Sequence, residues 1–296
     1  MEINEKVLLS YLEKIVNQIP KGKVTSYNEI AKALGDPFAR KFVFQNIKKI
    51  NGPWWRVINE KLEIKDLDQF GKLSLEIDIN DLRKNPEKYF FKNFNIDFKP
   101  LEYLRKVQKD LVEKIILEDK FDKIEKIAGV DLSYKKDIGY VVVVYFNKEL
   151  KVLEWFYKKV KVDFPYIPSF LAFREGPAVI KALENEELPD ILFVNGHGIS
   201  HPVNLGLATY VGVKLEIPTI GITKKILVGE IVGDKIIYNK KHVGWVISKF
   251  GYKVYASPGN MISLNTTKKL SYDFWIKGKY PEPIRVADEI SKKIKE

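Results

Sequence analysis

The sequence predicts two domains of different class. One is an N-terminal all-α helix-turn-helix domain over residues 1–65, and the other is a C-terminal α/β domain with a mixed sheet over residues 100–296. Apolar residues at helical spacing dominate the first part, and strand-like apolar runs separated by helices dominate the second. Charge divides the chain at the same place, since residues 1–65 carry a net +5, residues 66–99 a net −1 and residues 100–296 a net +7. We therefore predict a linker over residues 66–99.

Three helices are predicted in the N-terminal part. Apolar side chains recur at helical spacing over residues 7–16. Ser26 caps a second helix, with Glu29 three residues later as in a capping box, and this helix ends near Gly35. Pro37 then opens the third helix. The two short helices on either side of this turn form a helix-turn-helix candidate.

The C-terminal part is predicted to begin with a helix and a group of three strands. The helix is expected at residues 101–119, and the strands at residues 126–134, 139–146 and 151–159. Helices and strands then alternate, with helices near residues 169–184, 204–212, 264–276 and 284–295, and strands near residues 191–194, 219–222 and 243–257. Consecutive strands followed by alternation predict a mixed sheet with helices packed on it.

Composition restricts the function classes. The chain has 296 residues and a net charge of +11, which favours a polyanionic partner, nucleic acid above all. It has no cysteine, so disulfides, thiolate zinc sites and a cysteine nucleophile are excluded. The longest apolar run, residues 140–146, is far shorter than the roughly 18 residues of a membrane span. The first residues lack the layout of a signal peptide. We therefore expect a cytoplasmic protein without a membrane partner. A monomer is our working expectation, and the sequence leaves the oligomeric state open.

Residues 19–31, 34–35 and 53–57 together resemble the DNA-binding half of the alkylguanine-DNA alkyltransferase family. The resemblance covers about residues 5–65 and implies a winged-helix-like helix-turn-helix domain. In that family the last motif reads Pro-Cys-His-Arg-Val, and its cysteine accepts the alkyl group. Here Trp54 stands at the cysteine position and Trp55 at the histidine position. The resemblance is thus to the alkyltransferase-like proteins, which bind alkylated guanine without repairing it.

The same resemblance assigns roles in DNA binding. Tyr27 would press on the phosphate that rotates during base flipping. A basic residue at the start of the third helix would fill the vacated stack, and either Arg40 or Lys41 could be this residue. Arg56 is expected to hold the turn together rather than to contact DNA.

Five ordered blocks in the second part resemble endonuclease V. They are residues 128–134, 164–177, 194–202, 220–225 and 281–285, and the resemblance covers about residues 101–295. It implies a ribonuclease H-like fold and an endonuclease that hydrolyses a phosphodiester 3′ to deaminated bases, with deoxyinosine, the nucleoside of hypoxanthine, as the main substrate. The implied partner is double-stranded or single-stranded DNA with deaminated or alkylated bases, with RNA left open.

Hydrolysis of a phosphodiester requires hard oxygen ligands that hold magnesium, with manganese as a substitute. Asp131 on the first strand and Glu175 on the following helix are the expected ligands and catalytic residues. Two positions depart from the family, which has aspartate where this chain has Asn195 and histidine where it has Asp288. One hypothesis is that the two positions exchange roles, so that Asp288 restores the charge lost at Asn195. The rival hypothesis is a decayed nuclease that binds damaged DNA without cutting it.

The resemblance also implies roles around the metal site. Tyr166, Ile167 and Pro168 would form the wedge that inserts at the lesion. Leu171 and the backbone at Gly196 would line the pocket for the flipped deaminated base. Lys224 would stabilise the phosphate, with His201 near it as a further catalytic residue.

Overall fold

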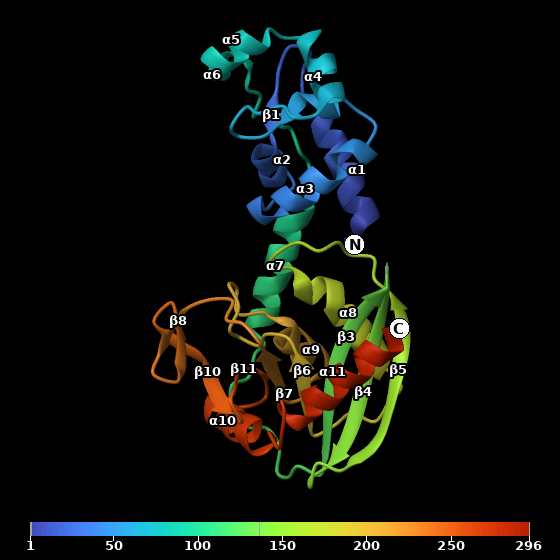
Figure 1. The fold of residues 1–296 in the computed structure, drawn as a ribbon, viewed down its shortest axis with the longest axis vertical. Coiled ribbons are helices and arrows are strands. Elements are labelled where there is room, and N and C mark those ends of the chain that lie inside the picture. The colour runs from blue at the N-terminus through green and yellow to red at the C-terminus, as the bar shows by residue number, and fades with distance from the viewer. Residues whose placement is uncertain (1, 136, 296) are drawn as a thin grey trace. The chain divides into compact units, whose positions relative to one another are not determined.

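The computed structural model describes residues 2–135 and 137–295, and it divides the chain into two compact units (Figure 1). The first unit contains the chain up to Val107 together with Phe164–Pro168, and the second contains Gln108–Asp163 and the chain from Ser169 onward. Among the described residues, no helix is both long and apolar enough to cross a lipid bilayer.

The first unit is mostly helical. Its first three α-helices are α1 (Glu5–Val16), α2 (Tyr27–Ala33) and α3 (Arg40–Asn46), with the short 3-10 helix η1 (Pro37–Ala39) between the last two. Ser26 caps α2 as predicted, because its Oγ accepts a hydrogen bond from the Glu29 amide at 3.2 Å. The unit is not all-α, since β1 (Thr25–Ser26) and β2 (Val57–Ile58) form a small parallel pair. Two further 3-10 helices are η2 (Ile47–Lys49) and η3 (Trp54–Arg56).

Residues 66–99 differ from the predicted linker. They contain three helices, α4 (Leu67–Ser74), α5 (Ile79–Lys84) and α6 (Pro86–Tyr89). Leu73, Ile77, Ile79 and Leu82 of this segment are buried in one cluster with Val24 and Ile58 of the preceding segment. Acidic residues of this segment also pair with basic residues before it, as in Lys48–Asp66 and Arg56–Glu76. The change of charge along the sequence therefore reflects ion pairing inside one folded unit.

The second unit contains a nine-stranded mixed sheet, in the order β5-β4-β3-β6-β7-β11-β10-β9-β8. Strands β3, β4 and β5 form an antiparallel meander, β3, β6 and β7 run parallel, and the remaining neighbours are antiparallel. The strands are β3 (Lys126–Lys135), β4 (Ile138–Asn147), β5 (Val152–Lys161), β6 (Ile191–Asn195), β7 (Thr219–Thr223), β8 (Glu230–Val232), β9 (Lys235–Tyr238), β10 (Lys241–Lys249) and β11 (Tyr252–Asn260).

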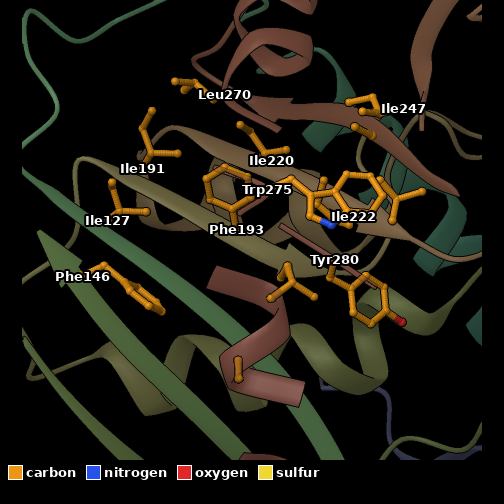
Figure 2. Packing of buried hydrophobic residues seen from close by; sticks show 14 of the residues in the cluster. Ile127, Phe146, Ile191, Phe193, Ile220, Ile222, Ile247, Leu270, Trp275 and Tyr280 are labelled. Carbon is orange, nitrogen blue, oxygen red and sulfur yellow. The ribbon is translucent and has the colours of Figure 1, made fainter. Parts of the chain in front are cut away.

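Five helices complete the fold. They are α7 (Pro100–Val112), α8 (Leu171–Leu183), α9 (Leu207–Leu215), α10 (Leu264–Asp273) and α11 (Glu282–Lys295). One face of the sheet forms a large core that includes Phe193, Trp245 and Trp275, closed by side chains of α10 and α11 (Figure 2). Alternate residues on the same strands, such as Ala128 and Val130, are also buried, so both faces of the sheet are covered.

The predicted order of strands and helices after residue 100 is present. Helices α7, α8 and α10 are shorter than predicted, α9 has the predicted length, and α11 begins two residues earlier than predicted. The α7 helix ends at Val112 rather than near residue 119. The hairpin of β8 and β9 was not predicted. The parallel strands β3, β6 and β7 end at one edge of the sheet, and this edge carries the candidate active site.

Candidate active site and DNA-recognition module

Close packing between β3 and α11 places Asp131. A Cβ atom at Gly129 would lie 2.1 Å from the carbonyl oxygen of Pro283, so only glycine allows the start of α11 to approach β3 this closely. Asp131 points to the same side of the strand two residues later, where α11 brings Ser291 to it.

Both carboxylate oxygens of Asp131 accept hydrogen bonds. The Nδ2 of Asn195, at the end of the neighbouring parallel strand β6, donates to Oδ1 at 2.7 Å. The hydroxyl of Ser291 donates to Oδ2. Burial nevertheless raises the pKa of Asp131, and the negative charge of Asp288 raises it further, whereas the two donors lower it. Asp131 is therefore a buried carboxyl without a cationic partner among the residues that affect its pKa.

Glu175 lies on α8 and is the second buried carboxyl of the site. The hydroxyl of Tyr134, three residues after Asp131 on β3, donates to its Oε1 at 2.8 Å. Burial raises the pKa of Glu175 to about 7, and the charge of Asp131 contributes in the same direction. Arg174 opposes this shift, and its guanidinium lies 4.9 Å from the centre of the Tyr134 ring.

Asp288 lies close enough to Asp131 to raise its pKa. Asn195 and Asp288, the two residues that depart from the family pattern, therefore both act on the carboxyl of Asp131. Its own carboxylate pairs with Lys292, one turn later on α11, and is only 15% exposed. No three His, Cys, Asp or Glu side chains in the described part of the chain form a ready-made metal cage. Asn195 contributes its amide nitrogen to Asp131 in this arrangement, rather than the carbonyl oxygen that a metal would require.

A tight glycine-rich loop follows Asn195. A Cβ at Gly198 would lie 2.1 Å from the Pro258 carbonyl oxygen, and one at Gly221 would lie 2.4 Å from the Gly198 amide nitrogen. At Gly196 the nearest atom is the Cβ of Leu207, at 2.9 Å. Side chains are thus excluded from this loop by contact with three other segments, which fixes its backbone beside Asp131.

The remaining predicted residues of the nuclease unit occupy different environments. Leu171 lies one helical turn before Glu175 and so shares its face of α8. Lys224 is exposed directly after β7, with its ammonium 4.9 Å from the centre of the Tyr280 ring. His201 is buried, and its Nδ1 accepts a hydrogen bond from the Val203 amide at 3.4 Å.

The segment predicted as a wedge belongs to the first compact unit. Tyr166 is 54% exposed, but Ile167 is fully buried and Pro168 is half-buried. Of the three residues, Tyr166 is therefore the one whose ring is accessible for insertion in this structure.

In the first unit, Tyr27 and Phe44 separate two neighbouring hollows. Their rings meet edge to face with centroids 5.3 Å apart. One hollow, of about 600 Å³, includes Arg40 and Lys41 in its lining, and the other, of about 370 Å³, includes Trp54. Burial raises the pKa of the Tyr27 hydroxyl, and the charge of Asp66 raises it further.

The two tryptophans have different surroundings. Two ammonium groups lie near the ring of Trp54, those of Lys48 at 4.7 Å and Lys72 at 5.0 Å from its centroid. Trp55 instead donates its indole N–H to Oε1 of Glu76 at 3.0 Å. Trp54 lines the smaller hollow, whereas the side chain of Trp55 is held by its hydrogen bond to Glu76.

Arg56 is bound to the fold through the hydrogen bonds of its guanidinium. Its guanidinium donates to both carboxylate oxygens of Glu76, at 2.7 and 2.9 Å, and to the carbonyl oxygen of Ile19 at 2.8 Å. Arg40 forms an exposed ion pair with Glu60 at 2.9 Å. Lys41 makes no side-chain hydrogen bond or ion pair with any residue that the structure describes.

Sequence reasoning missed four residues that support the sites. They are Ser291, Tyr134, Lys292 and Glu76. Ser291 and Lys292 follow Asp288 at helical spacing, which was visible in the sequence. The contacts of Tyr134 and Glu76 span 41 and 20 or 21 residues, and no local pattern signals them.

Comparison with known proteins agrees with both units. The family described as Endonuclease V matches residues 109–289, and the family described as the DNA binding domain of 6-O-methylguanine DNA methyltransferase matches residues 11–76. A relative from Nanoarchaeum equitans, named bifunctional methyltransferase-like/endonuclease, is 38% identical over 97% of this chain and 91% of its own length. An endonuclease V from Dictyoglomus thermophilum is 44% identical over 64% of this chain and 88% of its own length.

Among solved structures, endonuclease V of Ciona intestinalis in complex with a 24mer DNA containing an inosine is similar to this chain. It has 25% identity and a TM-score of 0.59, covering 67% of this chain and 98% of its own. Fold, site and sequence therefore define a DNA-repair nuclease fused to an alkyltransferase-like DNA-binding region. The chain belongs to the endonuclease V family, in the bifunctional form with a methylguanine methyltransferase DNA-binding domain at its N-terminus.

Proposed function

We propose that this chain is a magnesium-dependent endonuclease that hydrolyses a DNA phosphodiester 3′ to deaminated bases, hypoxanthine first, one bond beyond the lesion. The observation that carries the proposal is the pair of buried carboxyls, Asp131 and Glu175, at the edge where the parallel strands end. The inosine-containing DNA bound by the relative from Ciona intestinalis supports the substrate class. The antiparallel meander followed by parallel β6 and β7 supports a ribonuclease H-like fold.

The chemistry of the donors favours magnesium, although the carboxylates are not gathered into a metal cage in the described part of the chain. Asp131 and Glu175 offer hard oxygen ligands, and both have a raised pKa because burial leaves their ionised forms poorly compensated. A divalent cation favours the ionised forms and so relieves this cost. Asp131, Glu175 and Asp288 would hold the ion, with the carbonyl oxygen of Asn195 as a further ligand and manganese as a substitute. Bound magnesium supplies orientation of water and neutralisation of the charge that develops on the phosphate.

The chain's own residues orient the reacting groups. Asn195 and Ser291 hold Asp131 through one donor to each oxygen, and the hydroxyl of Tyr134 holds Glu175. Lys224, exposed at the same end of the sheet, offers positive charge to the phosphate. His201 is assigned by family resemblance to the same neighbourhood.

Lesion recognition is assigned to both units. Tyr166 would insert at the lesion, and Leu171 with the backbone at Gly196 would line the pocket of the deaminated base. In the N-terminal unit, Trp54 and Tyr27 border a hollow that would take an alkylated guanine. Because the chain has no cysteine, we propose binding of this base without alkyl transfer.

A second function has its own supporting observation. Both oxygens of Asp131 are engaged by neutral donors, and Asp288 is engaged by Lys292. If these hydrogen bonds and this ion pair remained in the presence of magnesium, no metal would bind, and the chain would be a scaffold that binds damaged DNA without cutting it.

The test is direct. Purified protein is incubated with a labelled duplex that contains one deoxyinosine, with magnesium or with EDTA, and the product is sized on a denaturing gel. The proposal expects a magnesium-dependent nick at the second phosphodiester 3′ to the inosine, and no nick with Asp131→Ala. Specific binding with no nick by the parent would favour the scaffold.

A further inference from the structure

The outer strands of the nuclease sheet carry an aromatic surface that the proposed chemistry does not use. Trp155 and Tyr157 lie on β5, and Tyr140 lies on β4 with Lys159 of β5 directly opposite it. We call these four residues the aromatic strip. We propose that the aromatic strip is a stacking platform for single-stranded DNA, separate from the lesion pockets and from the cutting reaction.

The strip is exposed because the covering helix stops short of it. The α11 helix packs on β3 and β4, and β5 is the edge strand of the sheet beyond them (Figure 1). Trp155 pairs with Val144 and Tyr157 with Val142, and both valines are fully buried. Yet Trp155 is 50% and Tyr157 42% exposed, so on this face the side chains of β4 are buried and those of β5 are not. Large aromatic side chains left exposed side by side mark a binding surface.

The rings are arranged for stacking. Tyr140 and Tyr157 lie nearly parallel, at 25° with centroids 6.4 Å apart, and the ammonium of Lys159 is 5.5 Å from the Tyr140 centroid. Trp155 and Tyr157 are two residues apart on one strand, which separates them by about 6.7 Å. This is about twice the 3.4 Å between successive phosphates of one duplex strand along its axis. Only an unstacked single strand can therefore place consecutive bases on both rings.

Charge favours a polyanion over other occupants. Lys159 and Lys161 are exposed on the same side of β5 as the rings, and Lys135 lies in register with Lys161 across β4. Lys161 pairs with Asp163 at 2.8 Å, whereas the ammonium of Lys159 lies over the Tyr140 ring. A second copy of the chain would bring its own +11 net charge and be repelled. Aromatic rings interleaved with lysines are the combination that binds single strands without sequence preference.

The strip continues the side of the sheet that carries Asp131. In the strand register Asp131 lies opposite Val142, and Val142 lies opposite Tyr157. Two strand spacings separate the backbones of Asp131 and Tyr157, about 10 Å. The strip therefore lies on the same sheet face as the proposed cut site, beyond the strands that α11 covers, and it would hold an unpaired segment while the lesion is processed.

The experiment measures binding of a fluorescein-labelled oligothymidylate of about 20 nucleotides, which exceeds the site size of a typical single-strand-binding surface. EDTA is present, so cutting plays no part, and the oligonucleotide contains no lesion. Trp155→Ala with Tyr157→Ala should weaken binding at least about tenfold, because each base stacked on an aromatic ring contributes substantially to affinity. Affinity for a lesion-free duplex of the same length should change by less than about twofold, because its bases are already stacked.

Two further double variants make the result specific. Phe250→Ala with Tyr272→Ala is the matched control, since these aromatics are 53% and 49% exposed and flank Lys249 in the same unit. This control should bind as the parent does. Trp155→Phe with Tyr157→Phe keeps two aromatic faces and should retain most of the affinity, which excludes unfolding as the cause of the loss.

Three results would overturn the proposal. The first is an equal loss in the control variant, and the second is an equal loss of single-strand and duplex affinity. The third is unchanged DNA affinity with a change of sedimentation from dimer to monomer, which would assign the strip to a second copy. None of these results depends on whether the protein nicks inosine DNA.

Discussion

The amide nitrogen of Asn195 donates a 2.7 Å hydrogen bond to Oδ1 of Asp131, across the ends of two parallel strands. The family pattern has a carboxylate at the position of Asn195. A carboxylate there would face Asp131 with like charge, whereas the amide compensates it. We propose that Asp288, whose negative charge acts on Asp131 from α11, supplies the charge that Asn195 lacks. The altered residues are therefore coupled through one carboxyl, and this supports an exchange of roles.

Ionisation of Glu175 should make the metal-free protein less stable at higher pH. Its pKa is raised to about 7 in the fold, from 4.5 when exposed. The folded state therefore binds more protons than the unfolded state between these values, and stability falls as pH rises through this window. The loss amounts to about 3 kcal/mol. The stability of Glu175→Gln relative to the parent should therefore rise by about 3 kcal/mol as the pH increases from 5 to 8. Urea unfolding in EDTA measures this difference. The same stability difference between the two proteins at pH 5 and at pH 8 would refute the raised pKa of Glu175.

Removal of the Ser291 hydroxyl should shift the pH dependence of nicking. This hydroxyl donates to Oδ2 of Asp131 and lowers its pKa, so Ser291→Ala should raise that pKa and strengthen proton competition with magnesium. We expect a larger loss of activity at pH 6.5 than at pH 8.5, measured as initial nicking rates. Ser133→Ala is the control, because its hydroxyl donates to the Ser291 carbonyl at 3.1 Å and not to Asp131. Coincident pH profiles for the two variants would show that Ser291 does not tune Asp131.

The pair of Arg56 and Glu76 should stabilise the N-terminal unit. Their side chains are only 13% and 10% exposed, and Glu76 also accepts the indole N–H of Trp55. Glu76→Ala leaves the guanidinium buried without its partner and should cost about 3 kcal/mol in unfolding free energy. Glu29→Ala, which breaks the more exposed ion pair with Lys32, should cost less than about 1 kcal/mol. Unfolding followed by tryptophan fluorescence measures the free energy of unfolding of both variants. Equal losses for Glu76→Ala and Glu29→Ala would contradict a stabilising role of the pair of Arg56 and Glu76.

Trp54 should determine affinity for alkylated guanine without affecting the cutting of inosine DNA. It borders the hollow beside Tyr27 and offers a flat ring with two lysines nearby. Trp54→Ala should weaken binding of an O6-methylguanine duplex by about tenfold, since an aromatic stack is lost. Trp54→Phe should bind nearly as the parent, and nicking of an inosine duplex should be unchanged in both. If the two variants bound methylguanine equally well, the hollow would not be the recognition site.

The sequence predicted much of the fold and the positions of the site because both depend on local patterns. Strand β3 and the cap at Ser26 followed from apolar alternation and spacing, and Asp131 and Glu175 from motifs of contiguous residues. The hairpin of β8 and β9 was missed because such short, mostly exposed strands carry no clear alternation. The helices within residues 66–99 were missed, although Asp66 and Asp78 are N-cap residues, because the change of charge indicated a linker. The burial of this segment depends on distant residues such as Val24 and Ile58.

The most direct test of the account is a magnesium titration of inosine-duplex nicking with four proteins: the parent, Asp288→Ala, Asn195→Asp, and Asn195→Asp with Asp288→His. An exchange of roles predicts an active parent and an inactive Asp288→Ala. It also predicts no gain from Asn195→Asp, because a further carboxylate beside Asp131 resists ionisation. The double variant should recover the family's ligand set and cut. A parent that does not cut, together with activity gained from Asn195→Asp alone, would contradict the account and show a decayed nuclease.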